Sequence, residues 1–301
     1  MQTAVIFPGQ GTQRSGMGAA WREHPAWRVV EEAEATTGEP LGHLLCEADE
    51  ATLARTREAQ LAILLTSLVA WEAVRDSIAA PVAFAGHSLG QVTALIAAGV
   101  LDLATGIEFA AVRAAATQRA ADDHPGRMVA LLGADLEQAE AACAASPACW
   151  IANDNAPGQV VVAGTPEGVE AATEAARAVG VRRVTALNVG GAFHTPLMDD
   201  AVHELSAHLA DRRFGDAVTP IVANDDATAV TSGAEWRDRS APHVARRVRW
   251  REVQVRLADV GAERFLEVGA GSMLAALARR TVPAVEVMPV AVPEDLAGVR
   301  P

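Results

Sequence analysis

Short strand-like runs alternate along this chain with longer stretches in which apolar residues recur at helical spacing. The strand-like runs include residues 4–7, 81–84 and 264–268, and the helix-like stretches between them include 19–45, 50–80, 91–98 and 102–121. Alternation of this kind is typical of an α/β protein with a parallel sheet. Residues 60–71 are apolar on nearly every side, which predicts a helix buried against that sheet.

Residues 127–192 follow a different pattern. Strand-like segments at 128–133, 150–152, 159–164 and 181–189 are separated by a helix-like segment at 135–145, an expected loop at 153–158 and a helix that begins at Thr165. The resulting order, β-α-β-β-α-β, is that of a ferredoxin-like unit. We therefore predict a large α/β-hydrolase-like domain with a parallel sheet, residues 1–126 and 193–301, into which a small ferredoxin-like subdomain, residues 127–192, is inserted.

The pentapeptide Gly86-His87-Ser88-Leu89-Gly90 lies between the strand-like run 81–84 and the helix-like stretch 91–98. A serine at the apex of a sharp strand-to-helix turn is a nucleophile elbow, which exposes the serine oxygen. The backbone N–H of Leu89 would then point to the position where an oxyanion forms. Because G-x-S-x-G strings also arise by chance, the alternative is a surface turn that holds an inert serine.

The composition narrows the range of functions. The chain has 301 residues, of which 50% are hydrophobic, and its net charge of −13 argues against a protein that binds nucleic acid. No apolar run is long enough to cross a membrane, and the N-terminus lacks the pattern of a signal peptide. The three cysteines, Cys46, Cys143 and Cys149, show no disulfide or metal-ligand spacing, so we expect a cytoplasmic protein without a bound metal.

Two residues and one loop carry chemistry that the pattern alone leaves open. His194 lies where the inserted unit is expected to end, so it is either an ordinary loop histidine or a general base for Ser88. Arg113 lies among alanines and valine, where composition favours a side chain that reaches the surface over a buried charge. The glycine-rich loop 8–13 lacks nucleotide-binding fingerprints, so it is a flexible turn or a loop whose N–H groups approach a ligand.

Four motifs occur together in one order, and they are Pro8-Gly9-Gln10-Gly11-Thr12-Gln13, Gly86-His87-Ser88-Leu89-Gly90, Gly191-Ala192-Phe193-His194-Thr195-Pro196-Leu197-Met198 and Phe265-Leu266-Glu267-Val268-Gly269. With this combination, the chain resembles the malonyl-CoA:acyl-carrier-protein transacylases and the acyltransferase units of polyketide synthases over nearly its whole length. The resemblance implies ping-pong transfer of a malonyl-type acyl group from CoA to the phosphopantetheine thiol of an acyl carrier protein, without a bound cofactor.

The resemblance also implies the catalytic roles. Ser88 would attack the acyl thioester, and His194 would act as its base. The backbone carbonyl of His243 would orient the imidazole of His194. The backbone N–H groups of Leu89 and Gln10 would form the oxyanion hole.

Substrate-binding residues are implied in the same way. Arg113 would bind the free carboxylate of malonyl with two parallel hydrogen bonds, which replaces the interpretation from composition alone. Phe193 would exclude acyl groups with an α-branch. Gln60, His87 and Asn155 would also lie at the substrate pocket.

The chain departs from the family pattern in several places, at Gln91, Ala114, Thr117, His243 and Arg247. These departures favour a discrete acyltransferase of a polyketide or related assembly line over a housekeeping enzyme of fatty-acid biosynthesis. Three alternatives stay open: transfer of an unusual acyl group between carrier proteins, hydrolysis of an acyl thioester, and carrier binding without catalysis.

Arginines are concentrated between residues 237 and 256 of a chain that is acidic overall. A run of one charge is usually a solvated face, although it can also bind a partner of opposite charge. Since carrier proteins are typically acidic, our candidates for carrier docking are Arg246, Arg247, Arg249, Arg279 and Arg280. We expect the enzyme to be a monomer.

Overall fold

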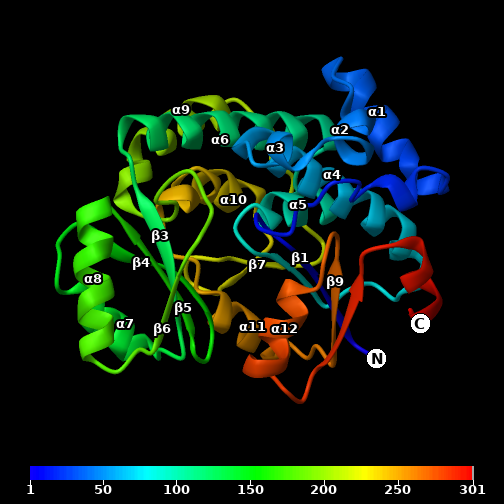
Figure 1. Cartoon of the computed structure of the whole chain (residues 1–301). Helices are drawn as coiled ribbons and strands as arrows, with labels where there is room; N and C mark the ends of the chain where they lie inside the picture. Colours follow the sequence, from blue (N-terminus) through cyan, green and yellow to red (C-terminus); the bar gives the residue numbers. More distant parts are fainter. Residues whose placement is uncertain (300–301) are drawn as a thin grey trace.

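The computed structural model describes residues 1–299, which form two β-sheets covered by helices (Figure 1). The strands are β1 (Thr3–Phe7), β2 (Ala83–Gly86), β3 (Arg127–Leu132), β4 (Cys149–Ala156), β5 (Gln159–Gly164), β6 (Arg183–Ala186), β7 (Ile221–Val222), β8 (Ala229–Val230), β9 (Arg264–Val268) and β10 (Glu286–Val290). The α-helices are α1 (Arg28–Thr37), α2 (Leu41–Cys46), α3 (Glu50–Leu53), α4 (Thr56–Val74), α5 (Gly90–Ala97), α6 (Leu103–Asp123), α7 (Leu136–Cys143), α8 (Pro166–Ala178), α9 (Asp199–Leu209), α10 (Gly233–Ser240), α11 (Trp250–Asp259) and α12 (Met273–Thr281).

The larger sheet has the strand order β10-β9-β1-β2-β7-β8, and its neighbouring strands are parallel except for β7 and β8. Alternate residues of β1 face opposite sides of the sheet: Val5 and Phe7 pack in the apolar core that includes α4, α5 and α6, whereas Ala4 and Ile6 pack with α11 and α12. Figure 1 shows the two groups of helices on opposite sides of this sheet. The α/β class predicted from the sequence pattern is confirmed.

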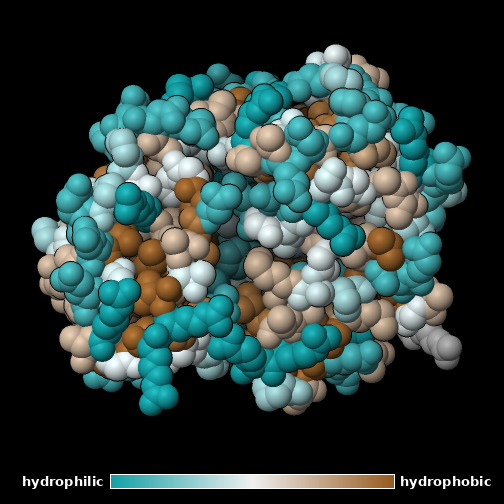
Figure 2. Space-filling view, viewed as in Figure 1, coloured by the Kyte–Doolittle hydropathy of each residue, from teal (hydrophilic) through white to brown (hydrophobic). Residues whose placement is uncertain are grey.

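The smaller sheet is antiparallel throughout, with the order β4-β5-β3-β6. Helices α7 and α8 cover one of its faces, where Leu131 and Val162 are buried. The opposite face carries a separate apolar cluster that includes Met128, Ala130 and Val161. In Figure 2, hydrophobic side chains gather over this sheet, and the surface is hollowed between it and the larger sheet.

The parallel strands bring two distant loops to one edge of the larger sheet. Strands β1 and β2 are in register with Phe7 opposite Gly86, so the loop after β1 and the turn after β2 leave the sheet side by side. The approach is so close that a Cβ atom on Gly9 would lie 2.4 Å from the carbonyl oxygen of His87. Ligands of open α/β sheets bind at this carboxyl edge, which is where Ser88 lies.

The predicted loop at residues 153–158 is mostly strand, because β4 continues to Ala156. Two register shifts in its pairing with β5 allow this continuation, and Asn153 forms a parallel bridge with Val248 on the other side. Polar residues such as Asn153 and Asp154 do not predict a strand, so only the long-range pairing explains it. The predicted last strand, residues 181–189, is shorter than expected and covers Arg183–Ala186.

Two further features concern the starts of helical segments. The helix-like stretch 19–45 is not one helix: short 3-10 turns precede α1, Pro25 begins the second of them, and α1 ends at its C-cap Gly38. Ser272 stands at the N-cap position of α12 without a side-chain capping bond. The buried carboxylate of Glu267 instead accepts from the backbone N–H groups of Leu274 and Ala275 at 3.0 and 2.7 Å. Among the described residues, no helix is long and apolar enough to cross a membrane.

Candidate active site

Ser88 lies on the turn between β2 and α5, and its backbone has a left-handed conformation with φ of 52°. The turn needs glycine on both sides: a Cβ atom on Gly86 would lie 1.9 Å from the backbone of Gly90, and one on Gly90 would lie 2.2 Å from the carbonyl oxygen of Phe7. A left-handed conformation is unfavourable for a residue with a side chain and is often found at functional sites. This strained turn presents the Ser88 hydroxyl at the sheet edge.

His194 faces Ser88 from the segment that follows β6. Its Nε2 lies 2.7 Å from Ser88 Oγ, and its Nδ1 lies 3.1 and 3.0 Å from the carbonyl oxygens of His243 and Arg246. Two carbonyl acceptors require a proton on Nδ1, which leaves Nε2 free to accept the proton of Ser88. The carbonyl of His243 is expected from the family resemblance, whereas that of Arg246 is a second acceptor.

Burial sets the protonation state of the imidazole. His194 is only 4% exposed, and this burial, together with the charge of Arg113, lowers the pKa of His194 to about 3. The imidazole is therefore neutral at pH 7, which is the form that a general base needs. Within residues 1–299, backbone carbonyls rather than a carboxylate accept from its Nδ1.

Arg113 is buried beside this pair, so the surface position favoured by composition alone is wrong. Its side chain donates from Nη2 to Ser88 Oγ at 3.2 Å and from Nη1 to Gln60 Oε1 at 2.7 Å. Among the described residues, no acidic group pairs with this guanidinium, and its Nε has no hydrogen-bond partner. Burial lowers the pKa of Arg113 to about 10, so the group remains a cation at pH 7. An anionic group bound in the cavity would stabilise this buried charge.

Leu89 and Gln10 line the same cavity, and each has a backbone N–H group. Neither of them donates a hydrogen bond within the part of the chain that the structure describes. By contrast, the N–H of Ser88 donates to Asn224, and the N–H of Gly90 donates to His87. Free N–H groups next to a nucleophile are suited to stabilise a developing oxyanion.

A cavity of about 460 Å³ opens onto Ser88 and His194. The residues that line it from the smaller sheet and the segment after it are Met128, Ala130, Asn153, Asn155, Gln159, Val161, Leu187, Asn188, Val189 and Phe193. Gln60 and Arg113 line it from the helices of the larger sheet. His87 Nε2 lies 2.8 Å from Asn155 Oδ1, and this contact links the elbow to β4. The structure thus places every predicted catalytic and substrate-binding residue at one cavity, with His243 behind His194.

Asn224, which follows β7, is a residue that the sequence analysis missed. Its side chain is fully buried, accepts from the backbone N–H of Ser88 at 2.9 Å and donates to the carbonyl of Gly86 at 2.8 Å. Its Oδ1 also lies 3.2 Å from Nε2 of His243. One amide side chain therefore holds the backbone of the elbow and contacts the residue whose carbonyl faces His194.

The arginines considered for carrier docking lie in different environments. Arg247 reaches inward to the carboxylate of Asp154 at 3.5 Å, and Arg251 contacts the same oxygen at 2.8 Å. Because the carboxylate of Asp154 is only 1% exposed, these ion pairs join β4 to α11 and to the segment before it, although both arginine side chains remain partly exposed. Arg247 is therefore committed to an internal ion pair.

The other four arginines lie nearer the surface. Arg246 pairs with Asp225 at 2.8 Å and Arg249 with Glu252 at 2.7 Å, and both arginine side chains remain partly exposed. Two further arginines end α12: Arg280 donates to the carbonyl of Pro157 and to Gln159, whereas Arg279 is exposed and forms no hydrogen bond or ion pair within residues 1–299. Of the five candidates, Arg279 has the charge that is freest to meet a partner.

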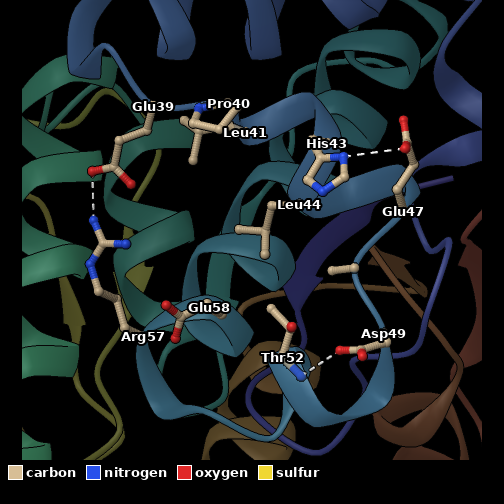
Figure 3. A pocket seen from close by; sticks show the side chains of 11 residues that line it. Glu39, Pro40, Leu41, His43, Leu44, Glu47, Asp49, Thr52, Arg57 and Glu58 are labelled. Carbon is tan, nitrogen blue, oxygen red and sulfur yellow. Dashed lines mark hydrogen bonds and ion pairs between the residues drawn. The ribbon is translucent and has the colours of Figure 1, made fainter.

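A second pocket, shown in Figure 3, lies at α2, α3 and the start of α4 and contains none of the predicted site residues. Two pairs of its side chains contact each other, Arg57 with Glu39 at 2.6 Å and His43 with Glu47 at 3.2 Å, and Asp49 caps α3. Polar groups that their neighbours already satisfy leave little need for a ligand, unlike Arg113 in the larger cavity. The residues with catalytic chemistry therefore lie at the larger cavity beside Ser88.

We expect the free energy of unfolding to fall as the pH drops below about 6.5. Burial lowers the pKa values of His87, His194 and His243 in the folded protein, to about 3 for His194, whereas all three would titrate near 6.5 in the unfolded chain. Between these pH values the unfolded chain binds more protons, so stability rises with pH by up to about 1.4 kcal/mol per pH unit for each histidine.

Urea unfolding measured from pH 5 to pH 8 tests this expectation. The variant His203→Gln, which changes an exposed histidine, should keep the wild-type slope. A free energy of unfolding that stays constant below pH 6.5 would contradict the assignment of three neutral buried imidazoles.

A serine on the elbow of an α/β sheet, with a neutral histidine at hydrogen-bonding distance, defines the class of enzymes that form acyl-serine intermediates. A model of the acyl transferase domain family matches residues 4–295. The chain therefore belongs to the acyl transferase family, in agreement with the resemblance found in its motifs.

The chain is similar to curated proteins named malonyl CoA-acyl carrier protein transacylase. It is 36% identical over 286 residues to that of Synechocystis sp., with 94% of each chain covered. It is 34% identical over 289 residues to that of Escherichia coli strain K12, with 93% of each covered.

Solved structures give the same result. An acyl carrier protein S-malonyltransferase from Vibrio cholerae has a TM-score of 0.95 at 32% identity, with 100% of both chains covered. A chain from the complex of a type II PKS acyl-carrier protein with its malonyl-transacylase also has a TM-score of 0.95 at 32% identity, with 99% of both chains covered.

Proposed function

We propose that this enzyme transfers a malonyl group from malonyl-CoA to the phosphopantetheine thiol of an acyl carrier protein, through an ester on Ser88. The observation that carries the proposal is Arg113, a buried cation 3.2 Å from Ser88 Oγ that has no acidic partner within residues 1–299. A malonyl group on Ser88 has one free carboxylate, which a guanidinium binds with two parallel hydrogen bonds. The names of the relatives and the structure of a malonyl-transacylase with its carrier protein support the same substrates.

The geometry suits the proposed proton transfers. His194 Nε2 takes the proton of Ser88 as Oγ attacks the thioester carbon, and the N–H groups of Leu89 and Gln10 stabilise the oxyanion. When the intermediate collapses, the imidazolium gives that proton to the sulfur of CoA, which leaves as a thiol. The thiol of the carrier protein then reverses these steps: it loses its proton to His194, attacks the ester and releases Ser88.

The proposed reaction takes place between two structural units, one built on each sheet. We infer a large α/β-hydrolase-like domain, residues 1–126 and 193–301, and a ferredoxin-like subdomain, residues 127–192. The antiparallel order β4-β5-β3-β6, with α7 and α8 on one face, supports the second assignment. The cavity then lies between the domain that carries Ser88 and the subdomain that supplies an apolar wall. A cytoplasmic location and a monomeric state remain predictions.

Mass spectrometry of the intact protein tests the proposed substrate. After a brief incubation with malonyl-CoA, we expect one malonyl adduct on Ser88, and addition of a carrier protein with its phosphopantetheine arm should remove it. Methylmalonyl-CoA and acetyl-CoA should label much more weakly, because Phe193 lines the cavity, where it would crowd an α-branch, and because acetyl lacks the carboxylate for Arg113. Stronger labelling by a neutral acyl-CoA would favour the transfer of another acyl group.

Hydrolysis is the second candidate, since water can attack the same ester. The open cavity at Ser88 does not by itself exclude water. Free malonate released without a carrier protein, compared with malonyl-carrier formed in its presence, separates the two functions. We expect transfer to exceed hydrolysis clearly.

We expect the docking of the carrier protein to depend on arginines around α12 and the segment before α11. Reversal of two of these charges, in the double variant Arg249→Glu/Arg279→Glu, should raise KM for the carrier about tenfold and leave labelling by malonyl-CoA unchanged. A matched control, Arg55→Glu/Arg182→Glu, reverses two exposed arginines outside this set. Equal KM values for the two double variants would remove these arginines from the docking surface.

A further inference from the structure

Two of the three cysteines meet in the structure although the sequence shows no disulfide pattern. Cys143 is the last residue of α7, Cys149 is the first residue of β4, and their sulfur atoms lie 4.0 Å apart. Cys46 lies on α2 in a different part of the fold. A disulfide needs a sulfur separation of about 2 Å, so rotation of the two side chains has to close the remaining gap of about 2 Å.

The turn between the two cysteines is compact and fixed. The N–H of Ser146 donates to the carbonyl of Cys143 at 3.1 Å, and the N–H of Cys149 donates to the carbonyl of Ser146 at 3.4 Å. These bonds hold the end of α7 against the start of β4. The two thiols are therefore held close enough to react without any movement of the helix or the strand.

The two thiols differ in access to solvent. Cys149 is 4% exposed and belongs to the apolar core of the smaller sheet, whereas Cys143 is half-buried at its border. A reagent in solution therefore reaches Cys143 first. The hydrogen bond between the two thiols lowers the pKa of Cys149 and raises the pKa of Cys143, so access to solvent, and not acidity, makes Cys143 the first to react.

We infer that Cys143 and Cys149 form a dithiol site that low-molecular-weight disulfides such as oxidised glutathione convert reversibly into an intramolecular disulfide. The Cys143 thiol loses its proton as its sulfur attacks one sulfur of glutathione disulfide, and the glutathione thiolate that is released takes up that proton. Cys149 then attacks the Cys143 sulfur of the mixed disulfide and releases the second glutathione. Two protein thiols are oxidised, one external disulfide is reduced, and the two protons end on the two glutathione molecules.

The location of the site predicts what its oxidation does. Strand β4 is at the edge of the smaller sheet, and its other end carries Asn153 and Asn155 at the cavity. Asn155 follows Cys149 by six positions along the strand, a rise of about 20 Å. The disulfide would connect α7 to this edge strand far from Ser88, so we expect it to stabilise the smaller sheet and leave acylation unchanged.

The test is treatment of the full chain with oxidised glutathione at pH 8, followed by intact mass and thiol counting. We expect the loss of two hydrogen atoms without a stable glutathione adduct, and a decrease from three free thiols to one. Peptide mapping should join Cys143 to Cys149. The melting temperature should rise by a few degrees, return after dithiothreitol, and be accompanied by an unchanged rate of malonyl labelling.

Single variants distinguish this pair from general thiol reactivity. Cys46→Ser should still lose two hydrogen atoms. Cys149→Ser should instead stop at a glutathione adduct on Cys143, and Cys143→Ser should keep a buried, unreactive Cys149. Three free thiols after treatment of the wild type, a stable glutathione adduct on it, or a bond to Cys46 would each overturn the inference.

Discussion

Replacement of Ser88 by alanine is expected to abolish the acyl-enzyme and to lower the rate of transfer by roughly 10⁴-fold or more. The reason is geometric: Ser88 Oγ is 2.7 Å from the neutral Nε2 of His194 and next to two free N–H groups, so the variant loses the atom that accepts the acyl group. Intact mass after incubation with malonyl-CoA measures the adduct, and the rate of carrier malonylation measures transfer.

The serine variant should remain folded, because its backbone N–H can still donate to Asn224. Circular dichroism and the melting temperature are therefore suitable controls. His194→Ala should lose nearly as much activity, and the double variant should lose little more, since the two side chains act as one unit. A malonyl adduct that persists on Ser88→Ala would place the nucleophile elsewhere.

The second large effect is expected for Arg113→Ala, which should lower kcat/KM for malonyl-CoA by about 10³-fold. The loss follows from charge-assisted hydrogen bonds, each of which contributes about 1.5–3 kcal/mol to carboxylate binding. Neutral acyl-CoA substrates lack the carboxylate, so their slower labelling should change far less. The measurement is the ratio of the labelling rates for malonyl-CoA and acetyl-CoA, compared between wild type and variant. A ratio that falls in the variant shows that Arg113 binds the carboxylate.

Two further variants separate recognition from packing at this position. Arg113→Lys keeps the charge but not the planar guanidinium, so it should recover only part of the malonyl activity. Gln60→Ala removes the side chain that accepts from Arg113 Nη1 and should have a smaller effect in the same direction. If malonyl and acetyl labelling fall equally in Arg113→Ala, the arginine supports the structure of the cavity rather than the carboxylate.

The local sequence predicts the elbow well because all its determinants are neighbours in the chain. Gly86, Ser88 and Gly90 lie within five residues, and the close contacts that require glycine arise in the turn itself and against the adjacent strand. The order of helices and strands is predictable for the same reason, since periodicity is a local property. His194 and Arg113 could be nominated, but composition alone favoured the wrong position for Arg113.

Other parts of the site depend on residues that are far apart in the sequence. Asn224 holds Gly86 across 138 residues, and nothing in the sequence around Asn224 indicates this partner. The second carbonyl acceptor for His194 belongs to Arg246, and a backbone group carries no signal in its side chain. Likewise, β4 runs through residues that favour turns because Val248 and β5 pair with it.

The separate apolar core of the smaller sheet has a consequence for engineering. Leu131 and Val162 pack under α7 and α8, while Met128 and Val161 face the cavity from the opposite side of the same strands. Substitutions at Met128 or Val161 can therefore change the shape of the cavity without altering Ser88 or His194. Redesign for bulkier acyl groups should therefore begin at Met128 and Val161, which lie in a different layer of the protein from Ser88 and His194.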